Sequence, residues 1–143
     1  MVNLADLHAS EGEDPTTLAE QATSLVDNGR WTLCNDGKGL ERGFRFKTFK
    51  AAWDFMNTVA AECKKQKHHP EWTNVYNKTH IRWTTHNPLG LSSKDTAMAR
   101  FCDDAGEQGG EVVVEGKGDW ESGVETGRLE AGDCCSGGGN KGV

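Results

Sequence analysis

Three histidines are the residues best suited to proton chemistry in this chain: the adjacent pair His68 and His69, and His86 further along. Histidine has an unperturbed pKa of about 6.5, so it can both donate and accept protons near neutral pH. A group of imidazoles therefore suits a reaction in which one atom gains a proton while a neighbouring atom loses one. For a histidine pair before a proline, the residues alone leave three alternatives open: a surface loop, a metal site or catalysis.

Metal binding is poorly supported by the spacing of the possible ligands. Structural zinc sites need about four nitrogen or sulfur ligands. His80 and His86 are six residues apart on a predicted strand, about 20 Å at about 3.3 Å per residue, so both cannot bind one ion. The five cysteines are an odd set without C-x-x-C spacing, which disfavours zinc ribbons and disulfide frameworks. We therefore expect no metal, no other cofactor and reduced thiols.

Three helices are predicted from the apolar periodicity and the capping residues. Asp14 and Thr48 are suitable N-caps for the first two helices, and Ser92 with Asp95 three residues later resembles a capping box for the third. His68-His69-Pro70 ends the second helix, because the residue before a proline favours an extended conformation. The predicted helices cover residues 16–27, 49–67 and 93–103.

Two hairpins complete the predicted secondary structure, with strands at residues 31–33, 40–46, 72–76 and 79–86. We expect a two-residue turn at Asn77-Lys78 in the second hairpin. Alternation along its second strand places Ile81 and Trp83 on one face, which we assign to the core together with Trp53 of the second helix. His86 then lies on the opposite, accessible face.

The element order is α-β-β-α-β-β-α, which indicates an α+β domain: a four-stranded antiparallel sheet with helices packed on one face. We assign residues 14–105 to this domain and residues 1–13 to a flexible N-terminus. Residues 104–143 hold nine acidic and three basic side chains and 12 of the 18 glycines, whereas the 13 acidic and 13 basic side chains of residues 1–103 balance. We therefore predict that residues 106–143 form a disordered acidic, glycine-rich tail.

Composition excludes several classes of function. The net charge of −6 argues against nonspecific nucleic-acid binding by the whole chain. No run of 18 apolar residues is present, so we expect no membrane span, and residues 1–20 lack the basic and apolar regions of a secretory signal. We expect a cytoplasmic protein, with the nucleus as an open alternative.

The spacing of several motifs resembles the signature of the pterin-4a-carbinolamine dehydratase family. The resemblance covers residues 18–103 without a large gap. Its most specific part is a histidine pair followed at fixed spacings by an aromatic residue, a histidine and an aspartate. The matching residues are Gly29-Arg30-Trp31, Phe44-Arg45-Phe46, Phe49, His68-His69-Pro70-Glu71-Trp72, Tyr76-Asn77-Lys78, Thr85-His86, Gly90-Leu91-Ser92 and Asp95.

This resemblance implies a hydro-lyase that dehydrates 4a-hydroxytetrahydrobiopterin to quinonoid dihydrobiopterin in tetrahydrobiopterin recycling. It implies that His68, His69 and His86 line the pterin site, with His68 and His86 as the proton-transfer pair and His69 mainly for binding. Asp95 is expected to orient His86, or to act only as a helix cap. The remaining residues expected around the pterin are Lys67, Trp72, Thr84, Thr85 and Asn87.

One position departs from the family pattern. Animal members usually carry glutamate where this chain has Lys64, and a cation lowers the pKa of neighbouring histidines. We therefore assign no acid–base role to Lys64.

The resemblance also implies partners other than the pterin. It implies a homo-oligomer, a dimer or a tetramer, which exposed sheet edges make physically reasonable. The alternative function is a non-catalytic binding module, a dimerisation cofactor that docks a helical surface on a homeodomain transcription factor.

Overall fold

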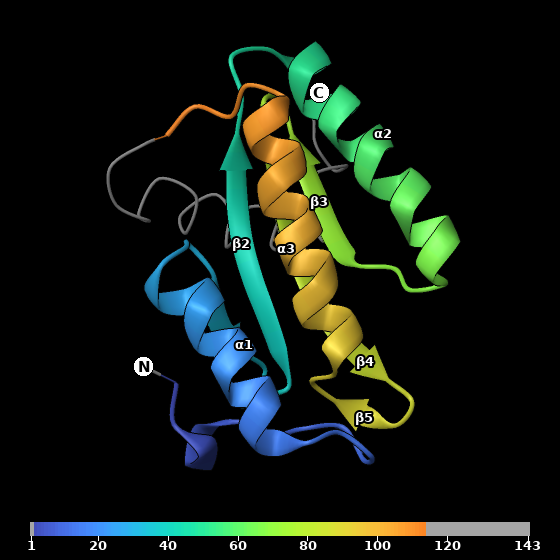
Figure 1. Ribbon diagram of the computed structural model, residues 1–143. Helices are drawn as coiled ribbons and strands as arrows, with labels where there is room; N and C mark the ends of the chain where they lie inside the picture. Colours follow the sequence, from blue (N-terminus) through green and yellow to red (C-terminus); the bar gives the residue numbers. More distant parts are fainter. Residues whose placement is uncertain (1, 114–143) are drawn as a thin grey trace, which may run out of the picture.

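A computed structural model describes residues 2–113, and its helices and antiparallel sheet confirm the predicted α+β fold. The three α-helices of this region lie on one face of the sheet, with α3 between α1 and α2 (Figure 1). In chain order the elements are η1 (Leu4–Asp6, a 3-10 helix), α1 (Pro15–Asp27), β1 (Thr32–Cys34), β2 (Gly39–Arg45), α2 (Phe49–Gln66), β3 (Glu71–Val75), β4 (Lys78–His86), β5 (Leu89–Gly90) and α3 (Ser93–Gln108).

The sheet has the strand order β1-β2-β4-β3, and all neighbouring strands are antiparallel. The short strand β5, which the sequence did not predict, pairs with the end of β4 through Thr85↔Gly90 and His86↔Leu89. Strand β4 is therefore the longest strand and contacts β2, β3 and β5. The residues at its end are held by more than one neighbour.

The helix ends show why these segments are helical. Asp14 accepts a hydrogen bond from the Thr16 amide at 3.2 Å at the start of α1, and Thr48 accepts one from the Ala51 amide at 3.1 Å at the start of α2. The predicted capping box at Ser92 is present at the start of α3. These caps satisfy backbone amides that have no partner inside the helix.

The core lies between the helices and the sheet and is rich in aromatic side chains. Trp83 is fully buried, as predicted, and Phe55 packs at 4.7 Å from Phe44 between ring centroids. The prediction that Trp53 is a core residue is wrong: it is 45% exposed and stacks on Phe49 at 5.8 Å. The buried face of α2 is rotated by about one position from the predicted stripe, and so includes Phe55.

The turn between β3 and β4 lies one residue earlier than predicted. Val75 pairs with Lys78, so the turn residues are Tyr76 and Asn77, and Tyr76 has a φ of 54°. The side-chain amide of Asn77 donates to the Phe46 carbonyl at 2.7 Å. This bond to the residue that follows β2 gives Asn77 a structural role in the turn.

Both ends of the described chain pack against the domain, which the sequence did not predict. Helix α3 continues five residues beyond the predicted end, and the Val112 amide after it donates to the Arg45 carbonyl at 2.8 Å. The buried guanidinium of Arg42 forms ion pairs with Asp103, at 2.5 Å, and with Glu111. The start of the predicted acidic tail is thus tied to β2, and residues 114–143 of that tail lie outside the described residues.

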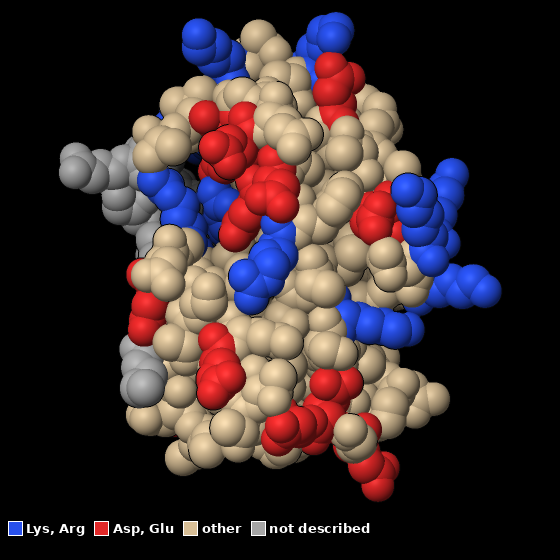
Figure 2. Space-filling model, in the orientation of Figure 1, with Lys and Arg blue, Asp and Glu red and all other residues tan. Residues whose placement is uncertain are grey.

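Charges on the helix side of the molecule are of both signs. Figure 2 shows acidic and basic side chains interspersed on this face, with a basic group at the right edge, where α2 lies in Figure 1.

Between residues 2 and 113, none of the helices has the length and apolar character needed to cross a bilayer.

Candidate active site

The end of α2 determines where His68 lies. Lys67 adopts a left-handed conformation with a φ of 56°, and the His68 amide then donates to the Cys63 carbonyl at 3.2 Å. The His68 ring stacks on Trp83 with ring centroids 5.6 Å apart and an interplanar angle of 21°. Its Nε2 atom lies 2.5 Å from Oδ1 of Asp95, and the side chain is only 11% exposed. His68 is therefore held on the helix side of the sheet.

Asp95 is a fully buried carboxylate with several donors around it. Its second oxygen, Oδ2, accepts hydrogen bonds from the Thr85 hydroxyl at 2.8 Å and from the Ser92 amide at 2.9 Å. A carboxylate accepts hydrogen bonds and cannot donate them. In the arrangement where Nε2 of His68 donates to Asp95, the lone pair on Nδ1 of a neutral ring is left free to accept a proton.

The partner of Asp95 differs from the expected one. Asp95 was expected to orient His86 or to act only as a cap, but it caps α3 and contacts His68. The reason is the alternation along β4, which directs Thr85 toward Asp95 and the next residue, His86, to the other face.

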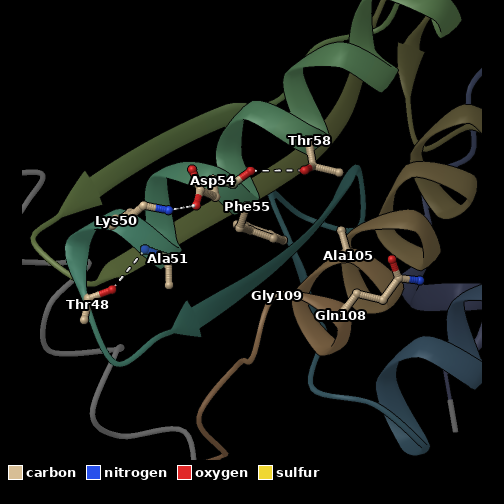
Figure 3. Close-up of a pocket in the computed structure, with 9 residues that line it drawn as sticks. All are labelled: Thr48, Lys50, Ala51, Asp54, Phe55, Thr58, Ala105, Gln108 and Gly109. Carbon is tan, nitrogen blue, oxygen red and sulfur yellow. Dashed lines mark hydrogen bonds and ion pairs between the residues drawn. The ribbon is translucent and has the colours of Figure 1, made fainter.

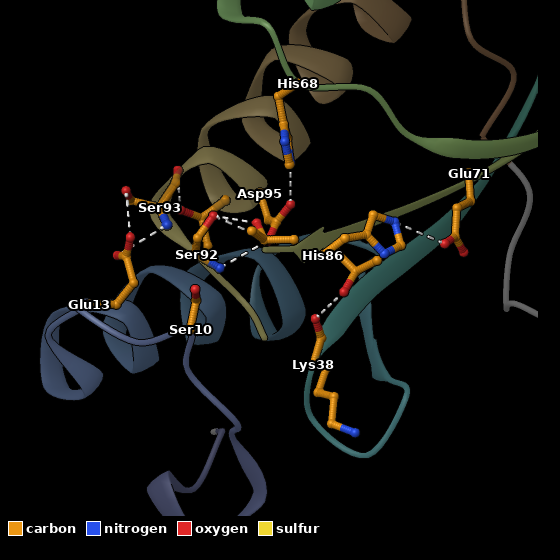
Figure 4. A network of polar contacts seen from close by, with 12 residues as sticks. Ser10, Glu13, Lys38, His68, Glu71, His86, Ser92, Ser93 and Asp95 are labelled. Atoms are coloured by element: carbon orange, nitrogen blue, oxygen red, sulfur yellow. Dashed lines mark hydrogen bonds and ion pairs between the residues drawn. The ribbon is translucent and has the colours of Figure 1, made fainter. Parts of the chain in front are cut away.

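His86 lies at the exposed end of β4, with 60% of its side chain accessible. Its Nε2 atom is 3.5 Å from a carboxylate oxygen of Glu71, the first residue of β3, and Figure 4 shows the ring pointing toward that residue. The other oxygen of Glu71 lies 3.6 Å from the Arg82 guanidinium. No role for Glu71 was predicted from the sequence, because its position opposite Arg82 follows from the register of β3 and β4.

The histidines surround one end of β4 and do not touch one another. Among the described residues, no hydrogen bond or ring contact joins any two of His68, His69 and His86. His68 lies on the helix side, His86 follows Thr85 on the other face, and His69 is exposed on the segment that joins α2 to β3. That the three imidazoles line one pterin site stays a prediction.

The other expected pterin-site residues fall into two groups. Lys67 and Asn87 are exposed, and Trp72 is half-buried against the core. The hydroxyls of Thr84 and Thr85 already donate within the protein, to the Lys38 carbonyl at 2.7 Å and to Asp95. Both hydroxyl protons are therefore already used within the protein.

A surface hollow of about 380 Å³ lies elsewhere, between α2 and the end of α3 (Figure 3). Its lining includes Thr48, Asp54, Phe55 and Gln108, and none of the three histidines. This hollow is separate from the polar network around Asp95.

The described cysteines are poor nucleophiles at neutral pH. Burial, assisted by the nearby Glu41 carboxylate, raises the pKa of Cys34 to about 12. Burial also raises the pKa of Cys63 and of Cys102. Proton transfer by histidine, with Asp95 and Glu71 as partners, is therefore the chemistry that this region supports best.

Comparison with known proteins gives independent evidence for the family of this chain. A family model for pterin 4 alpha carbinolamine dehydratase matches residues 14–105. A relative from Novosphingobium aromaticivorans is 48% identical over 84 residues, 59% of this chain and 88% of the relative. A relative from Rhodospirillum rubrum is 44% identical over 79 residues, 55% of this chain and 82% of the relative. Both are provisionally named pterin-4-alpha-carbinolamine dehydratases.

A solved structure shows the same fold. The crystal structure of a transcriptional coactivator/pterin dehydratase from Brucella melitensis superposes with a TM-score of 0.57 at 32% identity. The match covers 62% of this chain and 94% of that chain. The family model spans well over half of the chain and includes His68, His86 and Asp95, so the resemblance seen in the sequence is confirmed. This chain belongs to the pterin 4 alpha carbinolamine dehydratase family.

Proposed function

We propose that this chain is a hydro-lyase that removes water from a 4a-hydroxylated tetrahydropterin, with 4a-hydroxytetrahydrobiopterin as the substrate and quinonoid dihydrobiopterin as the product. The observation that carries the proposal is the contact of His68 with the buried Asp95, beside the strand end that bears His86. This contact orients one imidazole, and opposite an ionised carboxylate it would also select the tautomer with the proton on Nε2; an acid–base catalyst requires such positioning.

The proposed reaction balances without an electron donor or acceptor. The C4a–O bond breaks, and the hydroxyl takes up a proton and leaves as water. N5 of the pterin loses its proton as the C4a=N5 double bond forms. We assign proton removal to Nδ1 of His68, because Asp95 occupies Nε2. We assign protonation of the hydroxyl to His86, whose exposed ring exchanges protons with solvent and contacts Glu71.

The free edge of β4 is the proposed binding surface for the flat pterin ring. Strand β3 pairs with β4 no further than Arg82, and Trp83 and Thr84 pair with β2 on the other side. The backbone of β4 is thus open to the amide-like edge of a pterin at this point, as in strand addition. We propose that His69, Lys67, Trp72 and Asn87 border the ring, and that Thr84 and Thr85 contribute backbone groups.

The experiment follows quinonoid dihydropterin formation from synthetic carbinolamine with full-length protein. We expect the His68→Ala and His86→Ala variants to lose about 10²–10⁴-fold in rate, the usual contribution of a positioned acid or base. Asn57→Ala serves as the control, because Asn57 is an exposed residue in the middle of α2 and has no place in the proposed site. A wild-type rate equal to the buffer rate overturns the proposal. A loss below about threefold in His86→Ala overturns the role of His86.

A second proposed function is that of a dimerisation cofactor for a transcription factor. The Brucella melitensis relative is described as a transcriptional coactivator as well as a pterin dehydratase. In this chain Phe49 and Trp53 form an exposed aromatic pair on α2, a surface suited to a helical partner or to homo-oligomer formation. Loss of association in Trp53→Ala with an unchanged dehydration rate would separate this function from catalysis. We propose the cytoplasm as the site of catalysis, and the nucleus only for this second function.

A further inference from the structure

Residues 8–13, here called the N-terminal brace, precede the segment that matches the family model and pack beside the proposed site. The Leu91 amide donates to the His8 carbonyl at 2.9 Å, and the Ser10 amide donates to the Leu91 carbonyl at 2.7 Å. Ala9 and Leu91 form a parallel bridge. The brace therefore lies as an additional neighbouring segment beside Leu91, the residue that follows β5.

The side chain of Ser10 reaches the turn that follows His86. Ser10 is 4% exposed, and its hydroxyl donates to the Pro88 carbonyl at 2.7 Å. The brace approaches β5 so closely that a Cβ on Gly90, which has a φ of +136°, would lie 2.7 Å from the Ser10 amide nitrogen. Pro88 in this turn and Leu91 just after β5 are thus held by side-chain and backbone contacts from the same segment.

Glu13 connects the brace to the start of α3. Its carboxylate accepts hydrogen bonds from the Ser93 amide at 3.2 Å and from the Ser93 hydroxyl at 3.5 Å. The amides of the first helical turn have no partner within the helix, and a carboxylate there is favoured by the helix dipole. Figure 4 shows Ser10 and Glu13 on one side of the Ser92–Asp95 network and His68 and His86 on the other.

We infer that the N-terminal brace is a positioning element of the active site. It holds His86 through β5 and the Pro88 carbonyl, and it holds Asp95, and so His68, through Ser93 at the start of α3. The catalytic consequence of this inference rests on the proposed dehydratase function, whereas the placement of His86 and Asp95 does not. Small displacements of catalytic groups cost up to about 10²-fold in rate, so a loosened brace lowers kcat.

The test uses three variants of the full chain. Ser10→Ala removes the bond to Pro88, and Glu13→Gln weakens the contact with Ser93. Glu11→Gln is the matched control, because Glu11 lies in the same segment and is exposed. We expect Ser10→Ala and Glu13→Gln to lower kcat by about 3- to 30-fold with a smaller change in KM, and Glu11→Gln to behave as wild type.

Two further measurements separate positioning from a general loss of stability. Val59→Ala, in the core of α2, provides a variant of lowered stability with an intact brace. We expect Ser10→Ala to shift the His86 imidazole signals in nitrogen–proton NMR spectra and to speed amide exchange at Leu91 by at least about tenfold, and Val59→Ala to do neither. The inference is overturned if Ser10→Ala and Glu13→Gln leave the His86 signals, the Leu91 exchange and kcat as they are in Glu11→Gln. If wild type is inactive, the proposed function fails, and the NMR and exchange results still decide the inference.

Discussion

Asp95 connects the helix framework with the proposed chemistry. Its carboxylate completes the capping box of α3, accepts a hydrogen bond from the Thr85 hydroxyl and contacts Nε2 of His68. A buried carboxylate is costly unless its oxygens are satisfied by donors, and here strand, helix and histidine all supply them. The orientation of His68 is therefore coupled to the correct packing of α3 on β4.

Replacing Asp95 by asparagine tests this coupling. The side-chain amide of Asn would donate to Nε2 of His68 and favour the tautomer with the proton on Nδ1, which removes the proposed base. We expect Asp95→Asn to lower kcat by about 10²–10⁴-fold, as expected when an imidazole is held in the wrong tautomer. Nitrogen NMR of His68 and steady-state kinetics measure the two effects. Asp104→Asn, an exposed change on the same helix, is expected to alter neither, and an unchanged tautomer in Asp95→Asn would contradict the argument.

The sequence identified the candidate residues better than it identified their contacts. His68, His86 and Asp95 were named from their types and from their family spacing, and the capping role of Asp95 is confirmed. The pairing of Asp95 with His68 depends on how the start of α3 packs beside the end of α2, and the contact of Glu71 with His86 depends on how β3 lies against β4. The spacing of residues along the chain contains neither the helix packing nor the strand register.

At the scale of elements, the last turn of α2 controls the path of the chain into the proposed site. Lys67 occupies a left-handed conformation in which a non-glycine residue is strained, and the next two residues are His68 and His69. The strain is tolerated because the turn directs His68 onto Trp83 and Asp95.

Lys67→Gly is expected to relieve this strain, since glycine adopts the left-handed conformation without a steric penalty. We expect the free energy of unfolding to rise by up to about 1 kcal/mol. The glycine also gives the unfolded chain more conformational entropy, and the free-energy cost of that entropy reduces the gain. Urea unfolding of wild type and variant at one pH measures the difference. Lys65→Gly, two residues earlier in the last turn of α2, is the opposite control and should destabilise by about 0.5–1 kcal/mol. A loss of stability in Lys67→Gly as large as that in Lys65→Gly would show that Lys67 is not strained.

Helix and strand types were predictable, whereas the faces of α2 were not. The alternation in β4 correctly buried Trp83 and exposed His86. In α2, apolar residues occur on more than half of the helix surface, so two neighbouring apolar stripes fit the periodicity. The stripe that contains Phe55 packs on the sheet, and Trp53 is left exposed.

At the scale of the whole molecule, the sheet face opposite the helices carries a charged network. Glu41 lies 3.3 Å from Nε2 of His80 and 3.0 Å from the Arg82 guanidinium. The hydrogen bond from His80 is the main cause that lowers the pKa of Glu41 from 4.5 to about 2, against the opposing effect of burial, and Arg82 adds to it.

This lowered pKa predicts how stability depends on pH. Because the pKa of Glu41 is lower in the folded chain than in the unfolded chain, its contribution is complete above about pH 4.5 and is lost as the pH falls toward 2. We expect Glu41→Gln to be less stable than wild type at pH 6, and the difference to shrink between pH 4.5 and pH 2. Urea unfolding across this range measures it. Asp54→Asn, an exposed α2 change, is the control, and a difference between wild type and Glu41→Gln that stays constant with pH would contradict the assignment.

The domain as a whole was predictable because its elements alternate in one simple order with short connections. The packing of residues 8–13 and 109–113 was not, because these segments are short and polar and resemble flexible ends. Their contacts, Ser10 with Pro88 and Glu111 with Arg42, join positions far apart in the chain. Local composition gives no signal for such long-range contacts.

Cys102 lies on the buried face of α3, so its reactivity can report how often the domain opens. Its side chain is completely enclosed, and its raised pKa keeps the sulfur protonated in the folded state. A disulfide reagent can modify it only when α3 separates from β4, the same separation that would release Asp95 from Thr85. With the other four cysteines replaced by serine, the labelling rate of Cys102 would measure how often α3 separates from β4.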